Sequence, residues 1–391
     1  GAGIGSGRNG SVTIEGGTVT ATGGEKGAGI NSGDGGSVTI EGGTVTATGG
    51  EDCAGIGSGR NGSVMIAGGT VGATGGMNGA GIGGGGFSEN IRIMITGGTV
   101  TAAGGENGAG IGGGEDSYGT SITIESGTVT ANGGQYGAGI GGGRHSINGA
   151  ITIAGGRVIA VGGEDSAGIG GGRDSENSDI TITGGAVTAT GMGYGAGIGG
   201  GNSSNDIGIT LQGGVVCAEG GASARYDIGD GQSGSPGTLD ISGTAAVLLR
   251  TDRCISPTAP AHTHYGLTPV TRGRLFGISL PAGWTQSGAY IIPVTLTYDG
   301  KASDTVTQHI GTTIAAANSR RSGYVLTGWN TRKNGGGTAY KAGETFTFAE
   351  DTTLYAQWKR LYTLTYDANS GTGTGPSSVT SPSGGRITIM G

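Results

Sequence analysis

The sequence is poor in several residue types on which other classes of protein depend. Only 13% of its 391 residues are charged and 5% are aromatic, and it has eight prolines and three cysteines. So little proline, with no Gly-X-Y period, excludes collagen. The net charge of −7 argues against nucleic acid as a partner, because phosphate backbones attract clustered lysine and arginine. No run of 18 apolar residues occurs, so we expect no membrane insertion.

The three cysteines, Cys53, Cys217 and Cys254, show neither CxxC spacing nor pairing with histidines, which argues against a zinc site among them. Cys53 stands where the preceding repeat has a glycine and is interpreted as a small residue. Cys217 and Cys254 could form a disulfide in the oxidising compartment that secretion would imply. The chain begins inside a repeat, and we interpret it as a piece of a longer protein.

Glycine, in contrast, is present in large excess and is unevenly distributed. Of the 98 glycines, 79 lie in residues 1–250 and 19 in residues 251–391. Every tryptophan and every proline lies after residue 235. Such a composition is common in disordered tracts, but its uneven distribution indicates at least two different parts.

The first part is a repeat rather than a tract of low complexity. The tetrapeptide Ala-Gly-Ile-(Gly/Asn) recurs every 26 residues at first and every 29 or 30 residues later. In each copy, two segments with alternating apolar and polar residues follow it, as in residues 11–14 and 18–22, which is typical of strands with one buried face. The recurring isoleucines are Ile4, Ile30, Ile56, Ile82, Ile111, Ile140, Ile169, Ile198 and, in a degenerate copy, Ile228.

Apolar residues at fixed positions of the repeat form columns along the chain. Three strands per turn, separated by glycine corners, predict an all-β fold: a parallel, right-handed β-helix of about nine coils of 26–30 residues. The Gly-Gly pairs after each strand are expected to supply the positive φ of tight corners. The columns run from Val12 to Ile209, from Ile14 to Leu211 and from Val19 to Val216, with alanines that begin at Ala21.

The three extra residues of the later copies all enter between the Ala-Gly-Ile-Gly segment and the next strand. Insertions at one position of a solenoid stack along one edge, which is often the binding face. Carboxylates, amides and aromatic rings suit sugar hydroxyls, so we predict a ligand-binding edge; the alternative is that these loops are merely solvated. The predicted ligand-binding residues are Asn90, Asp116, Tyr118, Arg144, His145, Asn148, Arg173, Asp174, Glu176, Asn205 and Asp206.

A second corner carries acidic residues after a Gly-Gly pair. Oxygen ligands stacked one coil apart could hold calcium, and no other cofactor is expected. Because Met77, Gln135 and Gly193 interrupt the series, solvated carboxylates are the alternative explanation. The candidate calcium ligands are Glu25, Glu51, Asp52, Glu106, Glu164 and Asp165.

Two other patterns suggest alternative functions. Columns of threonine that begin at Thr18 resemble the flat surface of ice-binding proteins, although Arg157 interrupts them and threonine favours strands in any case. Asp174, Glu176 and Asp179 lie beside two arginines and form the one local cluster that could serve a polysaccharide lyase or hydrolase, which needs paired carboxylates. A charged loop in solvent explains that cluster equally well, and we predict that the protein is not an enzyme.

The chain changes character after residue 254. Residues 255–293 carry five prolines and an isolated His262-x-His264 pair, and we interpret them as a linker. The next segment contains Leu296-Thr-Tyr-Asp299, Gly323-Tyr-Val-Leu-Thr-Gly-Trp329, a turn at Asn334-Gly-Gly-Gly337 before Tyr340, and Asp351-Thr-Thr-Leu-Tyr-Ala-Gln-Trp358. These motifs resemble the internalin B-type repeat, also called the Listeria–Bacteroides repeat. The residues alone, with alternating strands, a glycine turn and two tryptophans, predict a small β-rich domain that has the tryptophans in its core. The resemblance implies a compact β-grasp-like module of a kind found in tandem on bacterial surface proteins.

The predicted domains follow from these boundaries. Residues 1–254 form the β-helix with a C-terminal cap, 255–293 the linker, 294–359 the B-type repeat, and 360–391, from Leu364-Thr-Tyr-Asp367, the start of a second, truncated repeat. Residues 1–250 are also loosely similar to β-helical carbohydrate-binding domains of secreted bacterial proteins.

Together these features favour a non-catalytic bacterial adhesin or polysaccharide-binding rod on a stalk of B-type repeats. It would be secreted or attached to the cell wall, outside the cell, and its partner would be a polysaccharide or glycoprotein of a cell surface or host. The alternatives are a β-helix polysaccharide lyase or hydrolase, a structural spacer and an ice-binding protein.

Overall fold

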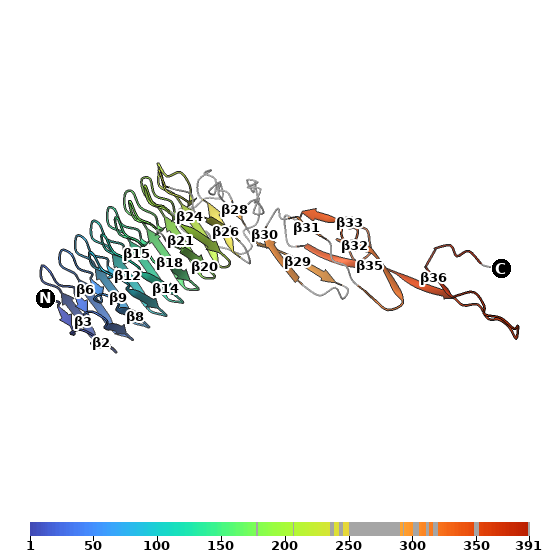
Figure 1. Ribbon diagram of the computed structural model, residues 1–391, viewed down its shortest axis with the longest axis horizontal. Helices are drawn as coiled ribbons and strands as arrows, with labels where there is room; N and C mark the ends of the chain where they lie inside the picture. Colours follow the sequence, from blue (N-terminus) through green and yellow to red (C-terminus); the bar gives the residue numbers. More distant parts are fainter. Residues whose placement is uncertain are drawn as a thin grey trace. The chain divides into compact units, whose positions relative to one another are not determined.

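The computed structural model divides the chain into two compact parts, Gly1–Ile292 and Pro293–Gly391 (Figure 1). None of the described residues forms a helix, and hence none forms one that could cross a membrane. The described residues are 1–176, 179–205, 207–234, 238–241, 245–249, 290–291, 293–299, 305–309, 313–315, 320–347 and 352–389.

The first part is a parallel β-solenoid in which each coil contributes one strand to each of three sheets (Figure 1). The first sheet has nine two-residue strands: β1 (Ile4–Gly5), β4 (Ile30–Asn31), β7 (Ile56–Gly57), β10 (Ile82–Gly83), β13 (Ile111–Gly112), β16 (Ile140–Gly141), β19 (Ile169–Gly170), β22 (Ile198–Gly199) and β25 (Ile228–Gly229). The second has nine: β2 (Ser11–Ile14), β5 (Ser37–Ile40), β8 (Ser63–Ile66), β11 (Arg92–Ile95), β14 (Ser121–Ile124), β17 (Ile151–Ile153), β20 (Asp179–Ile182), β23 (Gly208–Leu211) and β26 (Thr238–Ile241). The third has ten: β3 (Thr18–Thr22), β6 (Thr44–Thr48), β9 (Thr70–Thr74), β12 (Thr99–Ala103), β15 (Thr128–Asn132), β18 (Arg157–Val161), β21 (Ala186–Thr190), β24 (Val215–Glu219), β27 (Ala246–Leu249) and β28 (Tyr290–Ile291).

Strands of successive coils pair in register, so that like residues stack on one another. Ile14 pairs with Ile40 in the second sheet, and Val19 pairs with Val45 in the third. The stacked isoleucines, valines and alanines form one core cluster, and most of them have no exposed surface. Because each coil is covered only by its neighbours, a single coil could not be stable alone. The predicted parallel β-helix, with three strands per turn and these apolar columns, is confirmed.

The two Gly-Gly pairs of each coil are required for different reasons. After the second-sheet strand, the second glycine has a positive φ, for example 83° at Gly98, as predicted. The first glycine of that pair is replaceable, and Ser126 occupies its place in one coil. After the third-sheet strand the prediction of positive φ is wrong for pairs such as residues 133–134. There, a Cβ on Gly134 would collide with the carbonyl oxygen of Gly105 in the preceding coil, so close backbone stacking requires glycine.

The third sheet ends with a change of strand direction. β27 continues the parallel stack, and β28 pairs with it in antiparallel fashion, with Val247 opposite Ile291. β27 therefore supplies the predicted closing coil, and residues 290–291 of the predicted linker belong to this sheet. Cys254, which could form a disulfide with Cys217, lies outside the described residues, as does the His262-x-His264 pair.

The second part is built around a mixed sheet. Its strands are β29 (Pro293–Asp299), β30 (Thr305–His309), β32 (Tyr324–Asn330), β33 (Ala339–Tyr340), β35 (Thr352–Leu364) and β36 (Val379–Pro382); β31 (Thr313–Ala315) and β34 (Thr345–Thr347) form a separate pair. β29 and β35 are parallel, and the other pairings are antiparallel. Trp329 is fully buried, as predicted, but Trp358 is only partly buried. β35 runs without interruption across the predicted boundary between residues 359 and 360.

Candidate functional site

The inserted loops form a continuous edge of the solenoid, which we call the loop edge: residues 86–90, 115–119, 144–148, 173–176 and 202–205. Backbone hydrogen bonds join each loop to the next. The N–H of Asp116 donates to the carbonyl of Arg144, and the N–H of His145 to that of Arg173, both at 3.0 Å. Toward the preceding loop, the N–H of Tyr118 donates to the carbonyl of Ser88 at 2.8 Å. The loops are therefore held in register in the same way as the strands.

The acidic second corner lies against the loop edge rather than apart from it. The N–H of Arg144 donates to the carbonyl of Asn107 at 2.8 Å, and the N–H of Arg173 to that of Tyr136 at 3.0 Å. In both pairs, the second-corner residue belongs to the preceding coil. From the sequence, the loop edge and the acidic second corner are predicted as two separate corners, whereas the structure brings them together into one polar surface.

One column of the loop edge has a left-handed backbone in every coil. Phe87 has a φ of 58°, Asp116 51°, His145 55°, Asp174 54° and Ser203 58°. Asn, Asp and His tolerate this region better than most residues, whereas a bulky aromatic residue there is a true outlier. Phe87 is nevertheless 59% exposed, so little packing offsets its backbone strain.

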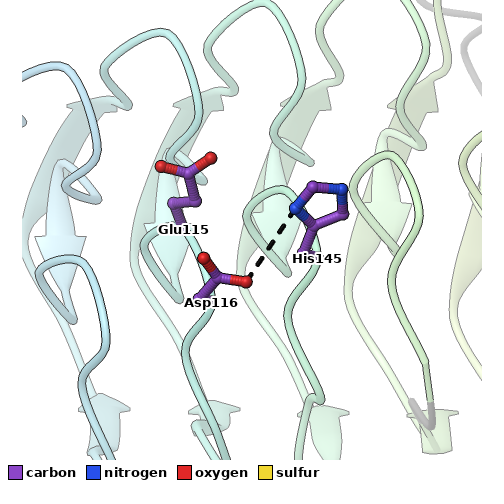
Figure 2. A group of neighbouring side chains, drawn as sticks. All are labelled: Glu115, Asp116 and His145. Atoms are coloured by element: carbon purple, nitrogen blue, oxygen red, sulfur yellow. Dashed lines mark ion pairs between the residues drawn. The ribbon is translucent and has the colours of Figure 1, made fainter.

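Charged side chains of this column and its neighbours form ion pairs across successive coils, of which Figure 2 shows the one between Asp116 and His145. The imidazole of His145 lies between two carboxylates: its Nδ1 is 3.9 Å from Oδ1 of Asp116, and its Nε2 is 3.6 Å from Oδ2 of Asp174. Arg144 pairs with Glu115 at 3.7 Å. One ligand atom from each of Glu115, Asp116 and His145 lies within 4.8 Å of the other two, so these side chains are placed to share a metal ion.

Two arginines of the loop edge lie over one aromatic ring of the second corner. The guanidinium of Arg144 is 5.4 Å from the ring centre of Tyr136, and that of Arg173 is 5.2 Å from it. Arg173 also pairs with Asp165 at 3.5 Å and with Asp174 at 3.2 Å. Both predicted arginines are thus already held by neighbouring side chains and present a fixed positive charge.

The other predicted ligand-binding residues differ in accessibility. Tyr118 is 48% exposed, and Glu176, two coils further along the same column of loop bridges, is also exposed. Asn90 is exposed, and its amide donates to Asn61 at 2.9 Å. Asn148 is buried and accepts a hydrogen bond from Ser146 at 3.1 Å, so its predicted role at the surface does not agree with its position. Asn205 lies in the last bridge of the edge, and Asp206 lies outside the described residues.

Two of the six predicted calcium ligands of the second corner accept hydrogen bonds from amide side chains. Asp52 accepts a hydrogen bond from Asn78 at 2.7 Å, and Glu164 accepts one from Gln135 at 3.0 Å. Asp165 is paired with Arg173, and Glu25, Glu51 and Glu106 are exposed. Among the described residues, the group of metal-ligand atoms that comes together contains none of these six acids. Calcium at these positions stays a prediction.

An open pocket of about 290 Å³ lies where the last short loop meets the first long one. Its lining includes Arg60, Asp52, Cys53 and Phe87. Burial, and then the charge of Asp52, raise the pKa of the Cys53 thiol. The pocket thus combines an aromatic ring with charged groups of both signs.

The residues behind the alternative functions also have defined places. Asp174 is engaged by His145 and Arg173, whereas Glu176 and Asp179 are exposed. The threonines that begin at Thr18 stack in register on the outer face of the third sheet, where Thr128 pairs with Arg157.

Four residues of this surface are absent from the predicted set: Phe87, Glu115, Tyr136 and Arg60. Phe87 occupies the same position of the repeat as Asp116 and His145, so alignment of the loops could have identified it. Tyr136 gives no such signal, because its contact with the loop edge crosses from one coil to the next.

The fold and the loop edge define a repeat protein of the type found on cell surfaces, in which a β-solenoid is joined to a small repeat domain. The sequence profile of the beta helix repeat matches residues 12–34, 38–60, 93–115, 122–144, 151–173 and 180–202. The model of the Listeria–Bacteroides repeat domain matches residues 294–357, which confirms the resemblance.

A curated relative adds a limited comparison. A protein of Evansella cellulosilytica, named as a Gly-rich membrane protein, is 43% identical over 53 residues. That stretch covers 13% of this chain and only 6% of the relative, so it compares a segment and not the whole protein. No solved structure matches the chain.

Proposed function

We propose that the protein is a non-catalytic, extracellular bacterial adhesin whose loop edge binds a polysaccharide or the glycan of a glycoprotein. The solenoid supplies a rigid binding surface, and the Listeria–Bacteroides repeat domain belongs to the stalk that carries it. Secretion or attachment to the cell wall is part of this proposal.

Phe87 is the observation that carries the proposal. A bulky side chain in the left-handed region costs about 1–2 kcal/mol relative to a right-handed backbone, and an exposed ring recovers little of that by packing. A strained, exposed aromatic residue beside an open pocket is accounted for by a ligand that packs on the ring. Aromatic rings stack on the apolar faces of sugar rings, while charged groups such as Arg60 and Asp52 can hydrogen-bond to hydroxyls.

The regular spacing of the loop edge also supports a polymeric ligand. Tyr118 lies one coil beyond Phe87, and the loops that carry them are joined by backbone hydrogen bonds. Repeated, rigidly spaced polar groups suit a chain of repeated sugar units, because several weak contacts then add within one complex.

A glycan array probed with the full chain, with and without calcium, tests the proposal. We expect binding to a polysaccharide that falls at least tenfold in Phe87→Asn, although this variant should be more stable by about 1 kcal/mol because asparagine tolerates the left-handed backbone. Tyr362→Asn is the matched control, since Tyr362 is 53% exposed in the second part of the chain. It should bind as the unmodified protein does.

Three outcomes would contradict the proposal. If no polysaccharide binds, a structural spacer is the better description. If Phe87→Asn and Tyr362→Asn bind equally well, the loop edge is not the binding surface. Cleavage of a bound polysaccharide that is lost in Asp174→Ala would make the protein an enzyme.

A further inference from the structure

Three side chains of types that can bind metals lie where two adjacent loops of the loop edge meet (Figure 2). Glu115 and Asp116 come from one loop and His145 from the next. The left-handed backbone at Asp116 and His145 is fixed by hydrogen bonds to the following coil. The three side chains are therefore placed by the main chain and do not depend on a mobile segment.

The donor set favours a transition metal over calcium. Calcium takes oxygen ligands, whereas zinc accepts imidazole nitrogen together with carboxylate oxygen. Ligand atoms that each lie about 2.1 Å from a tetrahedral zinc are roughly 3.4 Å apart. The Nδ1 of His145 is already 3.9 Å from Asp116, and all three ligand atoms lie within 4.8 Å of one another, so side-chain rotation could close the site.

A carboxylate also lies near the far side of the imidazole. The Nε2 of His145 is 3.6 Å from Asp174, while the Nδ1 faces the other two carboxylates. Metal-bound histidines commonly donate their second N–H to a carboxylate, which fixes the tautomer and increases the basicity of the ligand. Asp174 comes from the coil beyond His145 and is placed to do this.

The side chains connected by these ion pairs also carry more negative than positive charge. Glu115, Asp116, Asp165 and Asp174 carry four negative charges, and Arg144 and Arg173 supply two positive charges. A divalent cation would neutralise the excess. The main competitor is Arg144, which pairs with Glu115 at 3.7 Å and would have to give up that carboxylate.

We propose that Glu115, Asp116 and the Nδ1 of His145 bind one zinc ion, with Asp174 positioning the imidazole. Three protein ligands leave a coordination position for water or for an oxygen of a ligand on the loop edge. The zinc site is independent of the proposed glycan binding. Metal binding is measured with no glycan present, so either proposal can fail without the other.

The test is calorimetric titration of the full chain with Zn²⁺, in a background of His262→Asn and His264→Asn that removes the other closely spaced histidines. We expect one zinc ion per chain and no comparable binding of Ca²⁺. His145→Asn should weaken zinc binding more than tenfold, and Asp174→Asn about tenfold, as for other outer carboxylates. Arg144→Gln should strengthen binding several-fold, because it frees Glu115.

Glu176→Gln is the matched control. It removes the same charge from the same edge at a position outside the cluster, so its zinc affinity should stay within twofold of that of the background protein. Absence of zinc binding, full retention of binding in His145→Asn, or an equal loss in Glu176→Gln would each overturn the proposal. Thermal unfolding of every variant without metal separates loss of the site from loss of the fold.

Discussion

The coils with 26-residue repeats and those with 29-residue repeats share one framework but differ along one edge. In the short-loop coils, the Arg8 and Asp34 side chains of an ion pair are 79% and 46% exposed. In the long-loop coils, the paired Arg173 and Asp165 side chains are 35% and 14% exposed. Three additional residues per coil thus convert a solvated edge into a partly desolvated polar surface, while the strands keep their register.

The backbone just after the repeated isoleucine shows the same difference. Gly112, in a long-loop coil, has a φ of 140°, which only glycine adopts readily. Asn31 occupies the equivalent place in a short-loop coil without a positive φ. The longer loop therefore leaves the strand in a direction that requires glycine, and this explains why asparagine occurs at that position only before the insertion begins.

The largest expected effect is on stability, when the residue after the repeated isoleucine is replaced in a long-loop coil and in a short-loop coil. Gly112→Asn should destabilise the solenoid by at least about 3 kcal/mol, because the new Cβ meets the carbonyl oxygen of Gly141 and the backbone is strained. Gly5→Asn should change stability by less than about 0.5 kcal/mol, since Gly5 has no positive φ and the atom nearest its new Cβ, the Cβ of Ala2 at 3.1 Å, belongs to an exposed residue that can shift. Urea unfolding followed by circular dichroism measures both, and equal losses would contradict the comparison.

A second effect concerns the two described cysteines. Burial raises the pKa of the Cys217 thiol, in a long-loop coil, to about 12, whereas Cys53 lines the open pocket of a short-loop coil. Because the thiolate is the nucleophile, iodoacetamide at pH 8.5 should modify Cys53 well before Cys217. Peptide mass spectrometry locates the label. Rapid labelling of Cys217 in the folded protein would contradict the prediction, because it would show that this thiol is accessible.

The raised pKa of Cys217 also gives a direction for the pH dependence of stability. The folded pKa of about 12 lies above the ordinary value of 9.0, so the unfolded chain loses this proton first as the pH rises. The contribution of the thiol is complete below pH 9 and decreases between pH 9 and 12. Cys217→Ala should reduce the loss of stability in that range.

The smallest expected effect compares the ion pairs. Arg173→Gln should cost about 1 kcal/mol, because its partners Asp165 and Asp174 are partly buried and its guanidinium lies over Tyr136. Arg8→Gln should cost less than about 0.3 kcal/mol, because its pair is exposed and screened by salt. Chemical denaturation at low and high salt measures the difference, which should vanish if both edges are equally solvated.

The repeat period predicts the solenoid because the interactions that stabilise it join neighbouring coils and recur with the same period. Columns such as the one from Ile14 to Leu211 alternate with polar residues at the period of a strand, and they stack only if each coil repeats the last. The glycines were harder to interpret. Gly98 needs a positive φ, whereas Gly134 needs room for a carbonyl of another coil, and composition does not distinguish the two.

The candidate site was predicted less completely, for a reason of geometry. Loop residues such as Asp116 and His145 could be identified because their insertion is visible in the sequence. The contacts of Arg144 and Arg173 with Tyr136, and of Arg173 with Asp165, depend on which coil lies beside which at the corner, and the repeat period does not predict this. Asn148 has the composition of a surface amide but turns inward to Ser146, which only packing decides.

The pocket beside Phe87 shows what a change of loop length does in a stacked fold. Identical loops fill the space above one another, so a uniform solenoid has a closed edge. Where the loop length changes, the first long loop has no equal beneath it, and a recess must open at that coil. A stacked protein can therefore acquire a binding cavity by inserting a few residues into a run of coils, with no change to its core.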